Sequence, residues 1–239
     1  MRTQTIPVSQ LSSQQIDTLY RLMSKYYEGF SESEFRTDLA KKNDIILLLD
    51  PTKIIVGFST IEIKPMPDDQ GNTIVAIFSG DTVLEKNYWG NGALGIAFVS
   101  YVFKVRCKNL DKCVYWFLMS KGYKTYLLMA NNSFCHYPRF EKSTPAKQQK
   151  LIDDFYSHRF GTRYSSDTGI VKAVGVCCHL REGTAEIKPE YLSIPRVNFF
   201  QQKNPNWKSG DELACIARVS LLIPFRYFFK RLVLKRRKL

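Results

Sequence analysis

The stretch Asn72–Phe98 constrains the fold more than any other part of the chain. Thr73–Leu84 is rich in β-branched and apolar residues, which predicts a mostly buried strand. Three glycines then cluster within residues 90–95, and from Ala93 onward apolar residues recur at spacings of three and four, which predicts a helix. A glycine turn that opens a helix directs unpaired backbone N–H groups at one point. The stretch therefore predicts an anion site.

The spacing of these glycines argues against two common nucleotide-binding loops. No Gly-Lys-Ser/Thr sequence follows them, so the turn is not a nucleoside-triphosphate loop. Gly90, Gly92 and Gly95 match the dinucleotide pattern by their letters. The strands expected before them, however, pair better as hairpins than as the first strand of a βαβ unit. The alternative is an ordinary strand-to-helix turn without a ligand.

Composition indicates a single large domain, or a domain with an extension, and a polyanionic partner. The chain has 239 residues, and 44% of them are hydrophobic, which is enough for a core. The formal net charge is +13 and the isoelectric point about 9.5. This balance favours a nucleotide cofactor, an acidic lipid surface or an acidic carrier protein. Nucleic acid is not expected, because no recognisable nucleic-acid motif accompanies the charge.

Cysteine and histidine usage predicts a reduced, cytoplasmic protein without a metal. The six cysteines form no Cys-x-x-Cys pair, and the three histidines are scattered, so neither a disulfide framework nor a zinc site is expected. Residues 1–15 are polar and lack the apolar region of a signal peptide. No stretch is long and apolar enough for a transmembrane helix.

The apolar periodicity predicts a helical start, a hairpin and then alternating elements. Helices are predicted over residues 11–30, 31–42, 93–109, 112–121 and 145–160. Strands are predicted over residues 45–49, 54–63, 73–84, 125–130, 169–180 and 197–202. The run 213–219 is either a helix or a strand, because periodicity does not separate short apolar runs.

Residues Leu11–Phe140 resemble the GNAT superfamily, the Gcn5-related N-acyltransferases. The resemblance rests on the order of the predicted elements, on Tyr88-Trp89-Gly90-Asn91-Gly92 as an acyl-CoA loop, and on Asn131 or Asn132 followed by Tyr137 and Phe140. The chain departs from the family pattern in the loop and before Phe140. If Gly92 is the central glycine of the loop, Trp89 replaces Gln or Arg and Leu94 replaces the last Gly or Ala; if Gly90 is central, only Asn87 departs. Arg139 replaces the glycine before Phe140.

The resemblance implies an α/β (α+β) fold with a mixed, mostly antiparallel central sheet flanked by helices. It implies a GNAT-like acyltransferase domain over residues 1–165. The remaining residues, 166–239, are expected to form a C-terminal extension that packs on this core, since no repeat or low-complexity linker separates the two parts.

The same resemblance implies an acyl-CoA or acyl-ACP (acyl carrier protein) donor and identifies the residues that would bind it. In the family, backbone groups of the central strand bind the acyl carbonyl and pantetheine, and the glycine loop binds the pyrophosphate. Here the corresponding cofactor-binding residues are Thr82, Val83, Leu84, Trp89, Gly90, Asn91, Gly92, Ala93 and Asn131.

Three side chains are candidates for proton transfer. Asp81 is the only carboxylate inside the predicted central strand, where a charge is costly unless it faces a cleft or a partner; it is the candidate general base. The resemblance implies that Tyr137 protonates the leaving thiolate. His136 is a second candidate base. The alternatives are a bulge or edge role for Asp81, core packing for Tyr137 and a surface helix position for His136.

The expected function is therefore N-acylation of a small molecule, amino acid or peptide amine. The aromatic residues of the extension and the positive charge favour a long acyl chain, of the N-acyl amino acid synthase type, and a carrier-protein donor. A plain acetyltransferase is the first alternative. The second is a non-catalytic binding module, which the two departures from the family pattern favour.

The tail, residues 221–239, predicts a basic amphipathic segment. It combines seven Lys and Arg residues with aromatic and aliphatic residues and has no acidic residue. Such segments lie on anionic membrane surfaces or bind acidic proteins, so a peripheral membrane contact is one expectation. The alternative is a final helix that covers the core.

Overall fold

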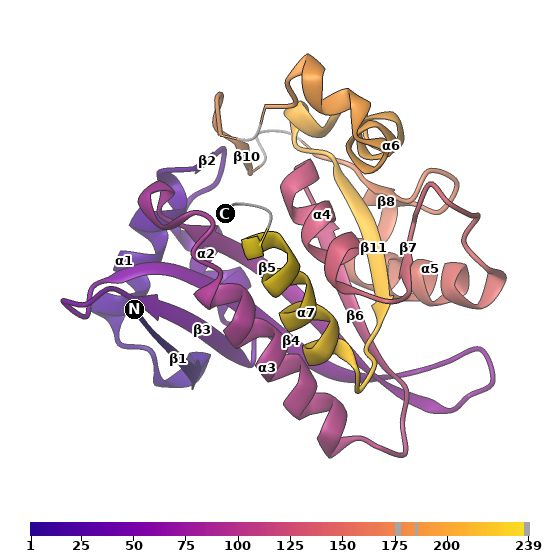
Figure 1. The fold of residues 1–239 in the computed structure, drawn as a ribbon, viewed down its shortest axis with the longest axis horizontal. Helices are drawn as coiled ribbons and strands as arrows, with labels where there is room; N and C mark the ends of the chain where they lie inside the picture. Colours follow the sequence, from indigo (N-terminus) through magenta and orange to yellow (C-terminus); the bar gives the residue numbers. More distant parts are fainter. Residues whose placement is uncertain (175–177, 185, 237–239) are drawn as a thin grey trace.

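A mixed sheet forms the centre of the molecule (Figure 1). The structure is a computed structural model that describes residues 1–174, 178–184 and 186–236, with side chains as far as residue 229. Within these residues the strand order is β1 (Arg2–Pro7), β3 (Asp44–Leu49), β4 (Ile55–Pro67), β5 (Thr73–Leu84), β6 (Val114–Ser120), β11 (Glu212–Arg218), β9 (Ile170–Val171) and β8 (Tyr164–Ser165); β7 (His136–Tyr137) also pairs with β11.

Only one of the described strand pairs of this sheet is parallel. It is β5 with β6, joined by the crossover helix α3 (Ala93–Lys108); the others are antiparallel. The predicted fold class, a mixed and largely antiparallel sheet flanked by helices, is confirmed. The extension contributes β11 to this sheet, beside β6. The division at residue 165 stays a prediction.

Side chains of the central strands point alternately to the two faces of the sheet, which divides the core into two layers. On β5, Val75 and Ile77 face one side of the sheet, while Ile74, Ala76 and Phe78 face the other. The first side is covered by α3, α4 (Tyr123–Asn132), α6 (Pro195–Lys203) and α7 (Ile223–Arg236). The second is covered by α1 (Ser13–Ser24), α2 (Glu32–Leu39) and α5 (Ala146–Phe160).

Two elements that follow the central strand differ in type from the prediction: the predicted helix is a strand, and the predicted strand is a helix. The helix predicted over 112–121 is wrong: these residues contain β6, in which Val114, Tyr115, Trp116 and Phe117 are all buried between two helical layers. A strand covered on both faces is apolar throughout and shows no alternation that would reveal it. The strand predicted over 125–130 is also wrong, because these residues lie within α4.

The buried residues of α4 show why a helix forms there. Tyr126, Met129 and Ala130 recur at helical spacing on one face, and Leu, Met and Ala favour helices. The strand predicted over 197–202 is helix α6, which begins with Pro195 in its first turn. The run 213–219 is resolved as β11 by its pairing with β6.

The predicted helix 11–30 ends early, at Ser24. Tyr27–Glu28 instead forms β2, which pairs with β10 (His179–Leu180). The strand predicted over 169–180 is present only as β9 and β10; residues 175–177 lie outside the described part. Of the predicted tail segment, Ile223–Arg236 forms α7, and residues 237–239 lie outside the described part.

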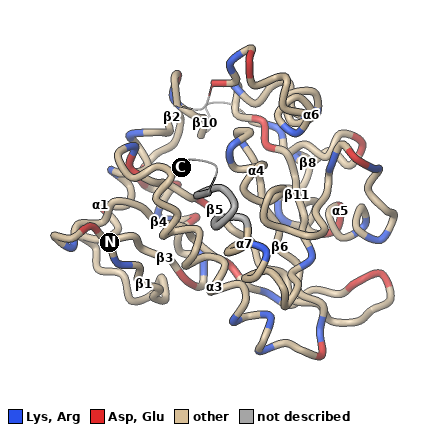
Figure 2. Tube along the Cα trace, viewed as in Figure 1, with Lys and Arg blue, Asp and Glu red and all other residues tan. Residues whose placement is uncertain are grey.

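Charge is spread over the described chain, with Lys and Arg interspersed with Asp and Glu (Figure 2). Among the described residues, none of the helices has both the length and the apolar character needed to cross a bilayer.

Candidate active site

The parallel strands β5 and β6 separate at their carboxyl ends. They are paired from Val75–Val114 to Ser79–Leu118, after which β5 continues beside β4 and β6 continues beside β11. A cavity of about 840 Å³ opens at this separation, lined by both strand ends. In open sheets, ligands bind outside the carboxyl ends of parallel strands, so the split marks the candidate site.

A β-bulge in β5 places Asp81 in this cavity. Ser59 pairs with Thr82 and Ile61 with Ser79, so Gly80 and Asp81 together oppose Thr60. Asp81 keeps part of its surface toward the cavity and is otherwise surrounded by protein.

The pKa of Asp81 is shifted toward neutrality by its surroundings. Burial raises the pKa to about 6; the carboxylates of Asp38 and Glu212 raise it too, while the ammonium groups of Lys121 and Lys42 lower it. A carboxylate with a pKa near the working pH is suited to general base catalysis.

A second group of charges lies across the gap. Lys121 Nζ is 3.3 Å from Glu212 Oε1 and 5.8 Å from the centre of the Tyr27 ring. Burial lowers the pKa of Lys121, but Glu212, Cys178, Tyr27 and Asp81 together outweigh this effect and raise it, so Lys121 stays protonated. Burial also raises the pKa of Tyr27, whose phenol therefore keeps its proton. The cavity thus holds a paired cation, a protonated phenol and the Asp81 carboxyl.

The far wall is formed where α2 and α5 approach Phe78. Lys42 Nζ is 2.9 Å from Asp38 Oδ2, and Lys42 and the Arg159 guanidinium both lie over the Phe78 ring. Gly80 is required here, because a Cβ would lie 2.6 Å from Thr60 Oγ1 and 2.8 Å from Lys42 Cε.

The glycine turn forms the opposite wall. Gly90 and Gly92 have φ of +79° and +76°, and Gly92 is the N-cap of α3. Trp89 Nε1 donates to the Leu84 carbonyl oxygen at 2.8 Å, and the Ala93 N–H donates to Asn91 Oδ1 at 3.1 Å. The turn is therefore a fixed loop that ends at a helix N-terminus.

Two lysines place positive charge near this loop. Lys124 Nζ lies 4.3 Å from the centre of the Trp89 ring. Burial and the positive charge of Lys86 both lower the pKa of Lys124. An anion at the loop would relieve their repulsion.

Helix α7 lies between α3 and α4 and closes part of the cavity (Figure 1). Ile223 and Tyr227 line it. Tyr227 Oη is 3.5 Å from the Gly92 carbonyl oxygen and would collide with any Cβ at Gly95. The glycine in the first turn of α3 therefore makes room for the C-terminal helix.

The structure brings most of the predicted site residues together. Asp81, Thr82, Val83, Leu84, Trp89, Gly90 and Gly92 line the cavity, and Asn91 and Ala93 belong to the same loop. Tyr137, His136 and Asn131 are not among the lining residues.

Asn131 belongs to the last turn of α4, and His136 and Tyr137 form β7, which follows it. Tyr137 is buried against α5. His136 packs edge-to-face on Tyr126, and burial together with Arg196 and Arg139 lowers the pKa of His136 to about 4. Asn131 Oδ1 accepts a hydrogen bond of 2.7 Å from Arg196. None of the three faces Asp81 through the cavity.

Sequence reasoning missed Tyr27, Lys42, Lys121, Arg159 and Glu212. Lys121 and Glu212 could have been found, because each borders a continuous apolar run, the same signal that identified Asp81. The other three carry no such signal, since only the packing of α1, α2 and α5 brings them to β5. Within the described residues, no cluster of three or more His, Cys, Asp and Glu side chains could hold a metal ion.

Comparison with known proteins gives structural matches only. No family model and no curated protein matches the chain. It is similar to a GNAT family N-acetyltransferase from Escherichia coli in complex with CoA (TM-score 0.36, 12% identity, 51% of this chain and 64% of that one, slightly under two thirds). It is also similar to a chain of the NatC complex bound to Gag peptide and CoA (0.42, 16%, 59% and 89%).

A third similar structure is an acetyltransferase from Trypanosoma brucei (TM-score 0.38, 16% identity, 60% of this chain and 98% of that one). These identities and TM-scores do not assign the chain to a family.

Because α7 contacts α3 at Gly95, we predict that Gly95→Ala destabilises the native protein but stabilises a variant that lacks the Tyr227 hydroxyl. In the native chain, Gly95→Ala should lower the free energy of unfolding by about 1–3 kcal/mol, because the methyl group displaces Tyr227. In a Tyr227→Phe background the same change should stabilise by up to about 1 kcal/mol, since alanine favours the helix. Urea unfolding of the four proteins measures both effects. Equal effects of Gly95→Ala in the two backgrounds would show that α7 does not pack on Gly95.

Proposed function

We propose that this protein is an N-acyltransferase of the GNAT type, which transfers an acyl group from an acyl thioester to the amine of a small molecule, amino acid or peptide. The observation that carries the proposal is the split between β5 and β6, with Asp81 on a bulge at its edge and a glycine-opened helix at its end. In this proposal they serve as the base and the anion site of one cavity.

The edge of β5 fits the amide-bearing arm of the donor. Beyond Ser79, β5 pairs with β4 alone, so every second backbone N–H and C=O points toward the gap. An extended chain with its own amides, such as pantetheine, would pair with those groups of Thr82–Leu84 that point away from β4, apart from the Leu84 carbonyl oxygen, which already accepts from Trp89 Nε1. Its pyrophosphate would then meet the loop at Gly90–Ala93, beside Lys86 and Lys124.

The apolar end of the cavity favours a long acyl chain over acetyl. Helices α3, α4 and α7 line it with Leu94, Phe98, Leu128 and Ile223. Burying each methylene group contributes about 0.8 kcal/mol, so a few buried carbons suffice for a tenfold preference. The donor is a CoA thioester or the thioester of an acidic carrier protein.

The cavity side chains fit the proton transfers of acyl transfer. The amine attacks the thioester carbonyl and passes its proton to Asp81, and the departing sulfur takes a proton as the thioester bond breaks. Since Tyr137 lies outside the cavity, we assign the second proton to Tyr27, which is protonated and near both Asp81 and Lys121.

Donor binding tests the proposal directly. Palmitoyl-CoA should bind at least about tenfold more tightly than acetyl-CoA in a calorimetric titration. Gly90→Glu should abolish binding of both by repelling the pyrophosphate. Gly71→Glu, in the loop between β4 and β5, is the matched control, because Gly71 has the same φ of +79° and a Cβ at either glycine would meet no atom within 4 Å.

The other outcomes of this titration are also informative. Binding of acetyl-CoA alone would indicate a plain acetyltransferase. Binding of neither compound would leave a carrier-protein donor or a non-catalytic binding module, and transfer from an acyl carrier protein would decide between these two.

The pH dependence of kcat/KM tests the role of Asp81. Activity should rise through an apparent pKa near 6, because only the ionised carboxylate accepts the proton. Asp81→Asn should reduce turnover by about two to four orders of magnitude. Glu212→Gln should move the rising limb to lower pH by removing a negative charge, and Lys121→Gln should move it to higher pH. A limb that neither variant moves contradicts the assignment.

Phenylalanine substitutions at Tyr27 and Tyr137 test which tyrosine protonates the departing sulfur. Tyr27→Phe should lower turnover by about two orders of magnitude with donor affinity retained, whereas Tyr137→Phe should change turnover less than about threefold. Single-turnover measurement of thiol release, with donor binding measured in parallel, distinguishes them. A loss confined to Tyr137→Phe would return the acid role to Tyr137.

A further inference from the structure

Helix α7 carries large apolar side chains on two opposite faces. Ile223 and Tyr227, four residues apart, face the cavity and are buried. On the opposite side, Phe225 and Phe229 are 71% and 70% exposed. A helix that is apolar on both sides is normally covered on both.

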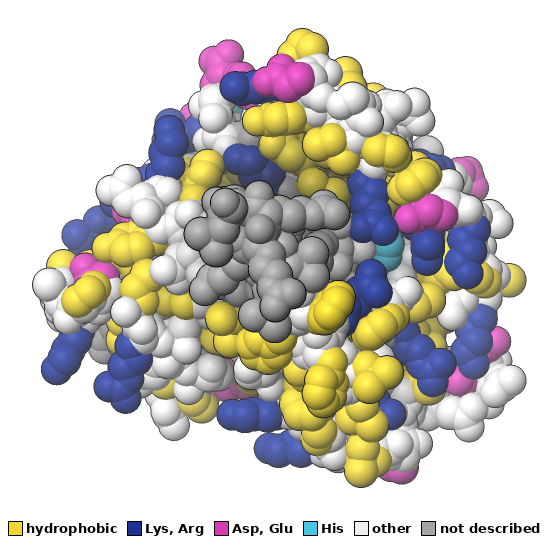
Figure 3. Space-filling model, viewed as in Figure 1, with side chains coloured by type: hydrophobic (Ala, Val, Ile, Leu, Met, Phe, Trp, Pro, Cys, Tyr) yellow, Lys and Arg dark blue, Asp and Glu magenta, His cyan; other side chains and the backbone are white. Residues whose placement is uncertain are grey.

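The outer face forms an aromatic patch. Phe225, Phe228 and Phe229 fall within one arc of α7 away from Ile223 and Tyr227, and the exposed Leu222 directly precedes the helix. The exposed ring of Phe134, which follows α4, contacts Arg226 of the same helix. We call these five residues the aromatic patch. Figure 3 shows hydrophobic side chains on this face of the molecule.

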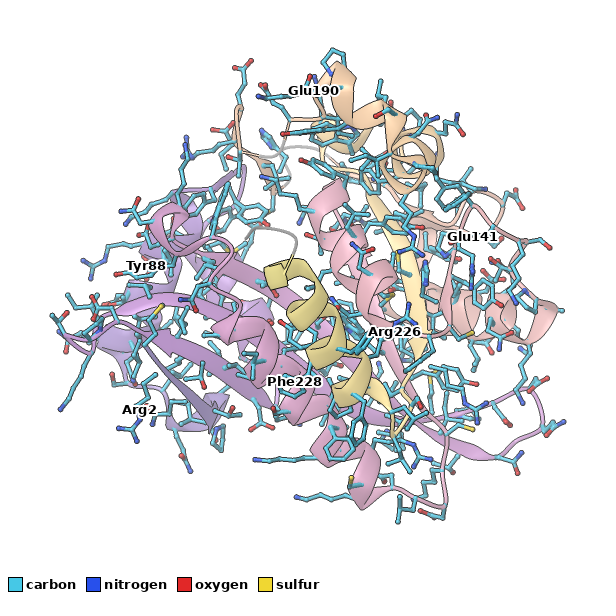
Figure 4. The ribbon with its side chains drawn as sticks, in the orientation of Figure 1. Arg2, Tyr88, Glu141, Glu190, Arg226 and Phe228 are labelled. Carbon is cyan, nitrogen blue, oxygen red and sulfur yellow. The ribbon has the colours of Figure 1, made fainter. Side chains whose placement is uncertain are left out.

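The surroundings of the aromatic patch are positively charged. The Arg226 guanidinium lies 4.7 Å from the centre of the Phe134 ring, and Arg226 and Phe228 project from opposite sides of α7 (Figure 4). After Glu212 the sequence has no Asp or Glu, while residues 226–238 include seven Lys and Arg. The helix therefore offers protruding rings together with charge of a single sign.

We propose that the aromatic patch of α7 docks on an anionic membrane surface. Protruding phenylalanines enter the interfacial region of a bilayer, and the basic residues of the same segment attract anionic headgroups. A second copy of this chain is disfavoured as the occupant, because it would bring two strongly positive tails together. This docking is independent of the acyltransferase proposal, since the inner face of α7 takes no part in it.

Vesicle flotation with the full-length protein tests the proposal. The protein should bind phosphatidylcholine vesicles that contain phosphatidylglycerol and should not bind pure phosphatidylcholine vesicles. Raising the salt concentration should weaken the binding, because exposed charges are screened.

A patch variant and a control variant distinguish binding through the aromatic patch from nonspecific adsorption of exposed apolar residues. Phe225→Ser/Phe229→Ser should weaken vesicle binding at least about tenfold. Ile54→Ser, which alters another exposed apolar residue (59% exposed) in the turn between β3 and β4, should leave it unchanged. Thermal unfolding followed by circular dichroism checks that both variants are folded, as expected because neither touches the buried face of α7.

Three results would overturn the proposal. The first is no binding of the native protein to either vesicle. The second is binding that Phe225→Ser/Phe229→Ser leaves intact. The third is a native dimer in sedimentation velocity that this double variant converts to a monomer, with no vesicle binding, which would assign the aromatic patch to a second copy.

Discussion

The separation of β5 from β6 is the constraint on which the rest of the structure depends. Each strand is held on its outer side, β5 by β4 as far as Leu84 and β6 by β11 as far as Ser120, so the two ends cannot rejoin. The gap leaves backbone polar groups along two inner edges that need partners. The bulge at Gly80–Asp81 adds a carboxyl to one of these edges.

Opposite charges in the cavity stabilise its buried ionised groups and also affect the pKa of Asp81. Asp81 shares the cavity with the carboxylates of Asp38 and Glu212, and the ammonium groups of Lys42 and Lys121 offset them. Since burial penalises an isolated charge, the buried ammonium group of Lys42 is offset by Asp38 and the buried carboxylate of Glu212 by Lys121. The same balance leaves the pKa of Asp81 between that of a surface carboxylate and neutrality, which is the property that a base working at neutral pH needs.

The C-terminal helix links the cavity to the surface. Through Ile223 and Tyr227, α7 completes the wall between α3 and α4, and the absence of a side chain at Gly95 lets it approach. Its outer side carries the aromatic patch. A ligand in the cavity and a partner on the surface would thus contact the same helix from opposite sides.

The sequence by itself determined the elements whose pattern is local. Strand β5 and helix α3 follow from a β-branched run and a helical period on either side of a glycine turn, and Asp81 was identified because a carboxylate is costly inside an apolar strand. The types of β6 and α4 were decided by tertiary structure, because a strand buried on both faces shows no period and TYLLMA is a short apolar run. The packing of α1, α2 and α5 around the sheet brings Tyr27, Lys42 and Arg159 to the cavity and leaves Tyr137 outside it. These residues are too far apart in the chain for a local sequence pattern to reveal that they meet.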